Sequence, residues 1–249
     1  MRIWTLLFIT VLLGCESQDS WDCLQGQGDL VQVNFEVDDF TSIRVRDRVE
    51  LILKQGPEQR VVIESGSSLL GDVSVLVEDG VLILTDANAC NLFREYGNTK
   101  AYVTAPNIDN IRNESGVTVR SDGVLSYPDL RLVSEDFTEN DRINTDGDFN
   151  LDLNVESLEI LSNNLSNFFI RGTADYAFIR LFSGDSRVEA QDLIAQDIEI
   201  FHRGTNQIFV HPVLSIFGEI RSGGDVISSN QPAVIDVVEY YTGRLIFLD

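Results

Sequence analysis

Three carboxylates with strand-like spacing are the residues of this chain best placed to do chemistry. Asp146, Asp148 and Asp152 fall on the polar side of a segment that alternates apolar and polar residues. Alternate residues of a β-strand share a face and lie about 6.8 Å apart, so the three carboxylates are expected to form a row. Such a row could hold calcium or serve an enzyme that cleaves polysaccharides.

The geometry of a straight strand argues against a metal at this row. A hard cation needs about six to eight oxygens that converge on one point, whereas side chains on a strand face diverge. We therefore interpret the row as a solvated acidic face. No metal or cofactor is expected, and calcium is kept as the weaker alternative.

The histidines and arginines are the remaining candidates for catalysis. A Ser–His–Asp arrangement would need His202 or His211, since the chain has two histidines. Both adjoin expected turns, so we predict that both face solvent. A polysaccharide lyase would instead combine an arginine with two carboxylates in a groove, and four arginines follow the repeat described below: Arg180, Arg187, Arg203 and Arg221. We predict no catalytic residue and no enzymatic activity, with lyase-like activity as the alternative.

A glycine ladder predicts the architecture that positions these side chains. Gly184, Gly204 and Gly224 are twenty residues apart, and Gly243 follows nineteen residues later. A period of about twenty residues in a strand-rich sequence is typical of a solenoid of stacked coils. The fold class expected is all-β, a parallel β-helix (β-solenoid) with the four glycines as corners that supply a positive φ.

The organisation along the chain divides this domain into two parts. Residues 106–249 show the regular coils, with three short apolar segments per repeat, each expected to be a strand. Residues 29–105 contain less regular strands, and Asp-Gly at 79–80 between two apolar alternations predicts a hairpin. Together, residues 29–249 are expected to form one β-helix domain.

The N-terminus predicts export and a lipid anchor. Residues 1–14 contain an arginine and a short apolar run, as a secretory signal peptide does, and Leu-Leu-Gly-Cys at 12–15 resembles the bacterial lipobox. Cleavage in that class leaves a lipidated cysteine, here Cys15, at the start of the mature chain. Residues 15–28 then form the lipidated end and a polar tether.

Two further cysteines suit an exported chain. Cys23 and Cys90 could form a disulfide that ties the tether to a loop. Two free thiols are the alternative that the sequence leaves open.

Charge and aromatic content bear on the partners. The formal net charge is −22, which disfavours binding to nucleic acid. Adjacent aromatics such as Phe168 and Phe169 cannot both point inward, so one of each pair is expected on the surface.

Several segments resemble a known bacterial family. They are residues 40–45, 53–56, 188–200, 203–210 and 214–232. They are similar to the "putative auto-transporter adhesin, head GIN domain" family over roughly residues 22–249. The resemblance implies a right-handed parallel β-helix, export as a lipoprotein, an adhesion role and no established catalytic residues. The chain departs from the family's Gly-Ser-Gly corners at 163–165 and 203–205.

These observations lead to one functional prediction. We expect a lipoprotein of the bacterial cell envelope, at the outer membrane with the leaflet left open, that acts as a non-catalytic adhesin-like or scaffold module. Its expected partners are the membrane through the lipid anchor, a glycan or protein ligand, and a second copy of the chain.

Overall fold

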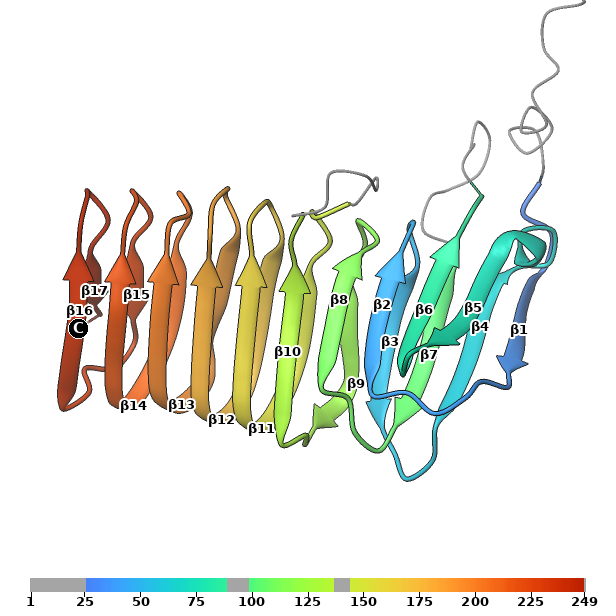
Figure 1. Cartoon of the computed structure of the whole chain (residues 1–249), viewed down its shortest axis with the longest axis horizontal. Coiled ribbons are helices and arrows are strands. Elements are labelled where there is room, and N and C mark those ends of the chain that lie inside the picture. The colour runs from blue at the N-terminus through green and yellow to red at the C-terminus, as the bar shows by residue number, and fades with distance from the viewer. Residues whose placement is uncertain (1–25, 89–98, 137–143, 249) are drawn as a thin grey trace, which may run out of the picture.

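The computed structural model describes residues 26–88, 99–136 and 144–248 of the chain. Within them, seventeen strands form one hydrogen-bonded sheet and the helical content is the three-residue 3-10 turn Leu70–Asp72, so the predicted all-β class is confirmed. Figure 1 shows the strands side by side along the long axis, with β1 at one end and β16 and β17 at the other. The strands of residues 26–105 are β1 (Leu30–Phe35), β2 (Ser42–Arg46), β3 (Glu50–Gln55), β4 (Arg60–Gly66), β5 (Val73–Glu78), β6 (Val81–Asp86) and β7 (Lys100–Ala105). Those that follow are β8 (Asn110–Glu114), β9 (Val119–Leu125), β10 (Asp129–Ser134), β11 (Phe149–Ser162), β12 (Asn167–Leu181), β13 (Arg187–His202), β14 (Ile208–Ile220), β15 (Val226–Ser228), β16 (Val234–Glu239) and β17 (Leu245–Phe247).

The repeat seen in the sequence appears as parallel pairing between successive repeats. Phe149 pairs with Phe168, which pairs with Val188, which pairs with Ile208, so one position of each repeat lies beside the same position of the next. These four side chains are fully buried. The rings of Phe149 and Phe168 stack with centroids 4.8 Å apart. Each repeat therefore covers the apolar side of its neighbour, which no repeat could do alone.

Each repeat between β11 and β14 consists of one long bent strand rather than the three short strands predicted. β12 has 15 residues and β13 has 16. Hydrogen bonding to the neighbouring repeat continues on both sides of the bend, so Phe149–Val155 pairs with Phe168–Ala174 and Ser157–Ser162 pairs with Tyr176–Leu181. The bends reorient the strand without interrupting the ladder.

The four corner glycines have two different physical roles, which corrects the prediction for three of them. Gly184 has φ +82°, the left-handed conformation expected of a corner. Gly204, Gly224 and Gly243 do not have a positive φ. A Cβ on Gly224 would lie 2.1 Å from the carbonyl oxygen of Asn206, and one on Gly243 would lie 2.3 Å from that of Gly224. For these two residues, glycine is required by the close approach of stacked turns.

The N-terminal part does not stack in chain order. β2 pairs in parallel with both β6 and β8, and β3 pairs in parallel with both β7 and β9. The repeat β2–β3 therefore lies between two repeats that follow it in the sequence. Antiparallel strands then close this end, since β4 pairs with β7, β1 with β4, and β5 with β6. We call residues 26–41 and 56–80, which include β1, β4 and β5, the N-terminal cap.

Two local predictions can be compared directly with these coordinates. The Asp79–Gly80 hairpin is confirmed, with both residues at positive φ between the antiparallel strands β5 and β6. Cys15, Cys23 and Cys90 lie outside the described residues. In the part of the chain that the structure describes, no helix has the length and apolar character needed to span a membrane.

Candidate binding site

The predicted acidic row does not lie on one strand, because Asp152 belongs to β11 whereas Asp146 and Asp148 precede it. Two hydrogen bonds from Asn167, one from its backbone N–H and one from its side-chain amide, reach Asp148 Oδ1 at 3.0 and 2.9 Å. Asp152 forms an ion pair with Arg171 at 2.7 Å, and Asp146 is exposed. Among residues 26–88, 99–136 and 144–248, no three acidic, histidine or cysteine side chains are grouped as a metal site would require. Asp148 caps a turn and Asp152 joins neighbouring repeats, so both have structural partners.

Three of the four arginines proposed for a lyase are paired on the outer face of the stack, and Arg203 is exposed. Arg187 lies 2.5 Å from Glu189, Arg180 pairs with Glu159, and Arg221 pairs with Glu219. Each guanidinium also lies over an aromatic ring, and the rings with their centroid distances are Phe178 at 3.9 Å from Arg180, Phe209 at 4.6 Å from Arg187 and Tyr240 at 4.4 Å from Arg221. The arginine side chains therefore cover the outward aromatic rings with their guanidinium groups and their aliphatic portions.

One arginine does meet two carboxylates, at a place that the sequence did not indicate. Arg112 contacts Glu114 and lies 3.3 Å from Glu135. The Glu114 side chain is only 1% exposed and is shared with Arg44 at 2.7 Å and Arg46 at 3.4 Å. Three guanidiniums therefore surround one buried carboxylate. Arginine remains protonated in proteins, so this cluster stabilises buried charge rather than providing a base for proton abstraction.

His202 is buried, and the prediction that it faces solvent is wrong. It occupies the last inward position of β13, opposite Leu181 and Ile220 of the neighbouring repeats. The backbone N–H of Gly204 donates to Nδ1 at 3.3 Å, so the ring proton lies on Nε2, which donates to the carbonyl of Asn206 at 2.9 Å. Burial lowers the pKa of His202, against the smaller opposing effects of this hydrogen bond and of Asp225. The ring is a neutral link between turns.

The aromatic pair at residues 168–169 divides as predicted. Phe168 is fully buried, and Phe169 points outward with 38% of its surface exposed. Phe178, Phe201, Phe209 and Phe217 are half-buried on the outer faces. The outer aromatics are thus mostly packed against their neighbours.

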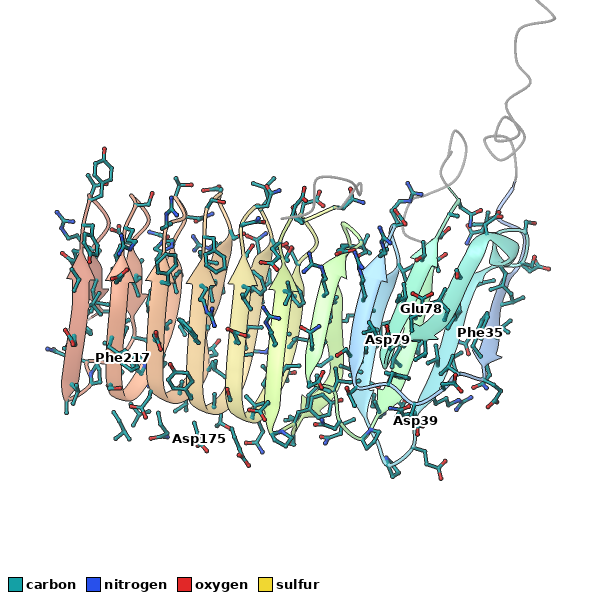
Figure 2. The ribbon with its side chains drawn as sticks, in the orientation of Figure 1. Phe35, Asp39, Glu78, Asp79, Asp175 and Phe217 are labelled. Carbon is teal, nitrogen blue, oxygen red and sulfur yellow. The ribbon has the colours of Figure 1, made fainter. Side chains whose placement is uncertain are left out.

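A hollow lies at the N-terminal cap. It is a groove of about 1000 Å³ between the end of β1, the segment 36–41, the turn at 57–60 and the end of β7. Figure 2 shows Phe35 and Asp39 at this end of the stack, far from Asp175 and Phe217. A smaller hollow of about 320 Å³, bordered by Glu36, Val37 and the strand β5, adjoins it. The segment that crosses from β1 to β2 forms one wall of the groove.

The groove combines an apolar floor with an acidic rim. Phe40 is buried, and Phe35 and Val37 pack partly against the core. The carboxylates of Asp39 and Glu58 have no hydrogen-bond or ion-pair partner among the residues that the structure describes.

Neighbouring side chains hold the walls of the groove in place. The side-chain amide of Gln59 donates to the carbonyl of Phe40 at 2.5 Å and accepts from its N–H at 3.2 Å. The guanidinium of Arg60 donates to Asn34 Oδ1 at 3.1 Å, which turns the one cation of the groove toward the wall. Rigid apolar surface beside unpaired charge is the usual composition of a ligand site.

The groove was not predicted from the sequence, although the sequence contains one feature that marks it. Residues 36–39 read Glu-Val-Asp-Asp between two apolar segments, which marks an acidic crossing. The walls come from segments that are distant in sequence, at residues 34–41, 57–60, 80 and 104–106. Their proximity depends on the exchanged order of the N-terminal repeats.

Comparison with known proteins places the chain in a family. The family model described as "Putative auto-transporter adhesin, head GIN domain" matches residues 39–232. The chain belongs to the head GIN domain family. This confirms the resemblance carried by the short segments, and the matched residues include most of the groove. No curated protein matches the sequence.

Solved structures of similar fold come from Bacteroides and Parabacteroides species. A "putative adhesin" of Bacteroides fragilis NCTC 9343 is 19% identical with a TM-score of 0.76, over 88% of this chain and 97% of that chain. A "putative lipid binding protein" of Parabacteroides distasonis ATCC 8503 is 15% identical with a TM-score of 0.64, over 90% of this chain and 98% of that chain. A "putative adhesin" of Parabacteroides merdae ATCC 43184 is 15% identical with a TM-score of 0.58, over the same shares of the two chains. At these identities the likeness supports the all-β head GIN fold alone.

Proposed function

We propose that this head GIN protein is a non-catalytic, adhesin-like binding module of the cell envelope whose ligand occupies the groove at the N-terminal cap. The observation that carries the proposal is the pairing of an apolar floor at Phe35, Val37 and Phe40 with the unpartnered carboxylates of Asp39 and Glu58. Burying the floor gains roughly 25 cal/mol per Å² of apolar surface, and the free carboxylates add attraction for a cation. The family name supports an adhesive role.

The ligand class that fits this composition is a peptide segment with apolar side chains beside a lysine or arginine. Asp39 and Glu58 are exposed and unpaired, so both carboxylates are available to a cationic group of a ligand. The cap contains nine carboxylates and a single arginine, so an anionic ligand would meet repulsion there.

The test uses soluble residues 22–249 and fluorescein-labelled heptapeptides of three matched compositions. These are lysine with leucine and phenylalanine, glutamate with the same apolar residues, and lysine with serine and glycine. Fluorescence anisotropy should show saturable binding of the first set alone. Asp39→Asn combined with Glu58→Gln should raise its Kd at least about tenfold, and Phe35→Ala should weaken it similarly.

Asp175→Asn provides the matched control, because Asp175 is exposed far from the groove and its loss should leave binding unchanged. Equal binding of the anionic peptides, or a Kd unaffected by the groove substitutions, would reject the assignment. Binding to a glycan array that survives Phe35→Ala would point to a carbohydrate ligand at another surface and would also reject it.

The architecture and placement belong to the same proposal. We infer a right-handed parallel β-helix carried on a tether from lipidated Cys15 at the outer membrane. The parallel pairing at a repeat of about twenty residues and the lipobox-like residues 12–15 support it. Metabolic labelling with palmitate should mark the wild-type protein and not Cys15→Ala, and label that persists in the variant would refute the anchor.

A further inference from the structure

The end of the stack opposite the groove has two strands that are paired on one side only. β16 pairs with β14, and β17 pairs with β15. Among the residues that the structure describes, no strand pairs with the other side of either one. We call β16 and β17 the terminal edge. Unpaired strand edges are ready templates for pairing with another chain, and proteins usually shield them with charge, proline or a covering segment.

The terminal edge is apolar instead of shielded. In the described part of the chain, thirteen large hydrophobic residues are exposed, and seven of them lie in residues 234–248, which contain β16, β17 and the turn between them. Each of the seven is at least 41% exposed. They are Val234, Ile235, Val238, Tyr240, Tyr241, Ile246 and Leu248. Apolar groups this concentrated on a monomer surface are typical of an interaction site.

Charge distinguishes the terminal edge from the rest of this acidic molecule. Residues 229–249 contain three carboxylate side chains, those of Asp236, Glu239 and Asp249, and one arginine, Arg244, which lies 3.5 Å from Glu239. The N-terminal cap, in contrast, has nine carboxylates against one arginine. In a protein of net charge −22, this end is where another copy can approach with little repulsion.

We propose that the terminal edge binds the terminal edge of a second copy, giving a tail-to-tail dimer with two-fold symmetry. β16 and β17 run in opposite directions on the two faces of the stack, joined by a short turn (Figure 1). A two-fold axis that passes through the stack from the face of β16 to the face of β17 reverses both the stacking direction and the strand direction. β16 then meets its copy antiparallel while β17 meets its own copy antiparallel, so one operation pairs both edges.

A head-to-tail arrangement does not fit these observations. It would place the apolar edge against the acidic cap, whose outer strands have a different pairing pattern. A head-to-tail contact also leaves a free end on each added molecule and builds open filaments, whereas the tail-to-tail contact closes at two copies.

Sedimentation velocity of soluble residues 22–249 across a wide concentration range tests the proposal. The wild type should pass from monomer to dimer and stop there. Val238→Lys should raise the dimer dissociation constant at least about tenfold, because it places a charge on the edge without touching the core. Leu214→Lys is the matched control, since Leu214 is 55% exposed against 47% for Val238 and lies on the side of the stack.

A second variant removes a hydrogen-bond donor in place of adding charge. The N–H of Tyr240 donates to Ile220 of the neighbouring repeat, so the alternation of a strand turns the N–H of Val237 toward the unpaired side. Val237→Pro should therefore weaken the dimer more than it lowers the thermal midpoint of the diluted monomer, in which Val237 packs only partly against the core.

Each outcome of these measurements bears on the contact. A wild type that stays monomeric at every concentration, or that grows beyond two copies, would overturn the proposal. So would a dimer that Leu214→Lys disrupts as strongly as Val238→Lys. None of these results depends on the groove, so peptide binding can fail while the dimer stands, and the reverse also holds.

Discussion

The two ends of the stack differ in how their outermost repeat is covered. At the N-terminal cap, the exchanged order of repeats and the antiparallel strands β1, β4 and β5 cover the last parallel repeat. At the terminal edge, β16 and β17 expose apolar side chains and unpaired backbone. In a stack of repeats each inner repeat is covered by its neighbours, but the repeat at an end has a neighbour on one side only.

The difference teaches where function can reside in such a protein. The middle repeats use their inward residues for the core, and four of the five arginines of residues 144–228 form ion pairs. Unpaired acidic groups border the groove at one end, and exposed apolar groups gather on the terminal edge at the other. We therefore assign ligand binding to one end and self-association to the other.

The largest expected effect comes from glycines that the stack and the cap use differently. Gly218 has φ +124°, and a Cβ there would lie 2.0 Å from the carbonyl of Ile200, whereas Gly71 in the cap has open space around it. Gly218→Ala should lower the free energy of unfolding by about 3 kcal/mol, through strain and collision together. Gly71→Ala should change it by less than about 0.5 kcal/mol. Denaturant titration measures both, and equal effects would show that the repeats tolerate a looser fit than described.

A smaller effect is expected where the cap joins the regular repeats. Glu114 is buried among three arginines, and Glu114→Gln would remove the carboxylate charge that Arg44, Arg46 and Arg112 share. We expect a loss of about 2 kcal/mol, below that of a fully buried pair because the arginines are partly exposed. Asp152→Asn, which breaks the exposed pair with Arg171, should cost less than about 0.5 kcal/mol. Chemical unfolding of the two variants measures both losses of stability. A Glu114→Gln variant as stable as the wild type would contradict this prediction.

The smallest effect concerns the pH dependence of stability at His202 in β13, which is separated from the terminal edge by β14. Burial lowers the pKa of His202 from its ordinary value of 6.5, so the folded chain holds fewer protons than the unfolded chain in mildly acidic solution. Its contribution to stability is therefore complete above pH 6.5 and is lost as the pH falls from there toward the lowered pKa.

We expect His202→Gln to remove this pH dependence between neutral and mildly acidic conditions. Thermal unfolding midpoints across that range provide the measurement. His211→Gln, at a half-exposed position, serves as the control. Parallel pH profiles for the wild type and His202→Gln would show that the ring is protonated without cost.

The repeat could be predicted from the sequence because it rests on local alternation. Phe149, Leu151 and Leu153 point inward along one strand, and the same pattern recurs about twenty residues later. The inward position of His202 followed from this rule, since Ile198 and Ile200 precede it at alternate positions. The nearby Gly204 suggested an exposed turn instead, and the close stacking of turns was not visible in a single repeat.

The groove and the cap could not be predicted because they depend on long-range order. Ser42 pairs with both Val81 and Asn110, a choice that no short segment encodes. The groove walls meet only after this exchange. The Asp79–Gly80 hairpin, by contrast, was predictable because the turn chemistry is contained in two residues.

Hydrogen–deuterium exchange at low and high protein concentration tests the contrast between the two ends most directly. The account predicts that amides of β16 and β17 become more protected as concentration rises, while those of β1, β4 and β5 stay unchanged. Val238→Lys should abolish the concentration dependence. Protection of β16 and β17 that is independent of concentration, or a change confined to the N-terminal cap, would contradict the account.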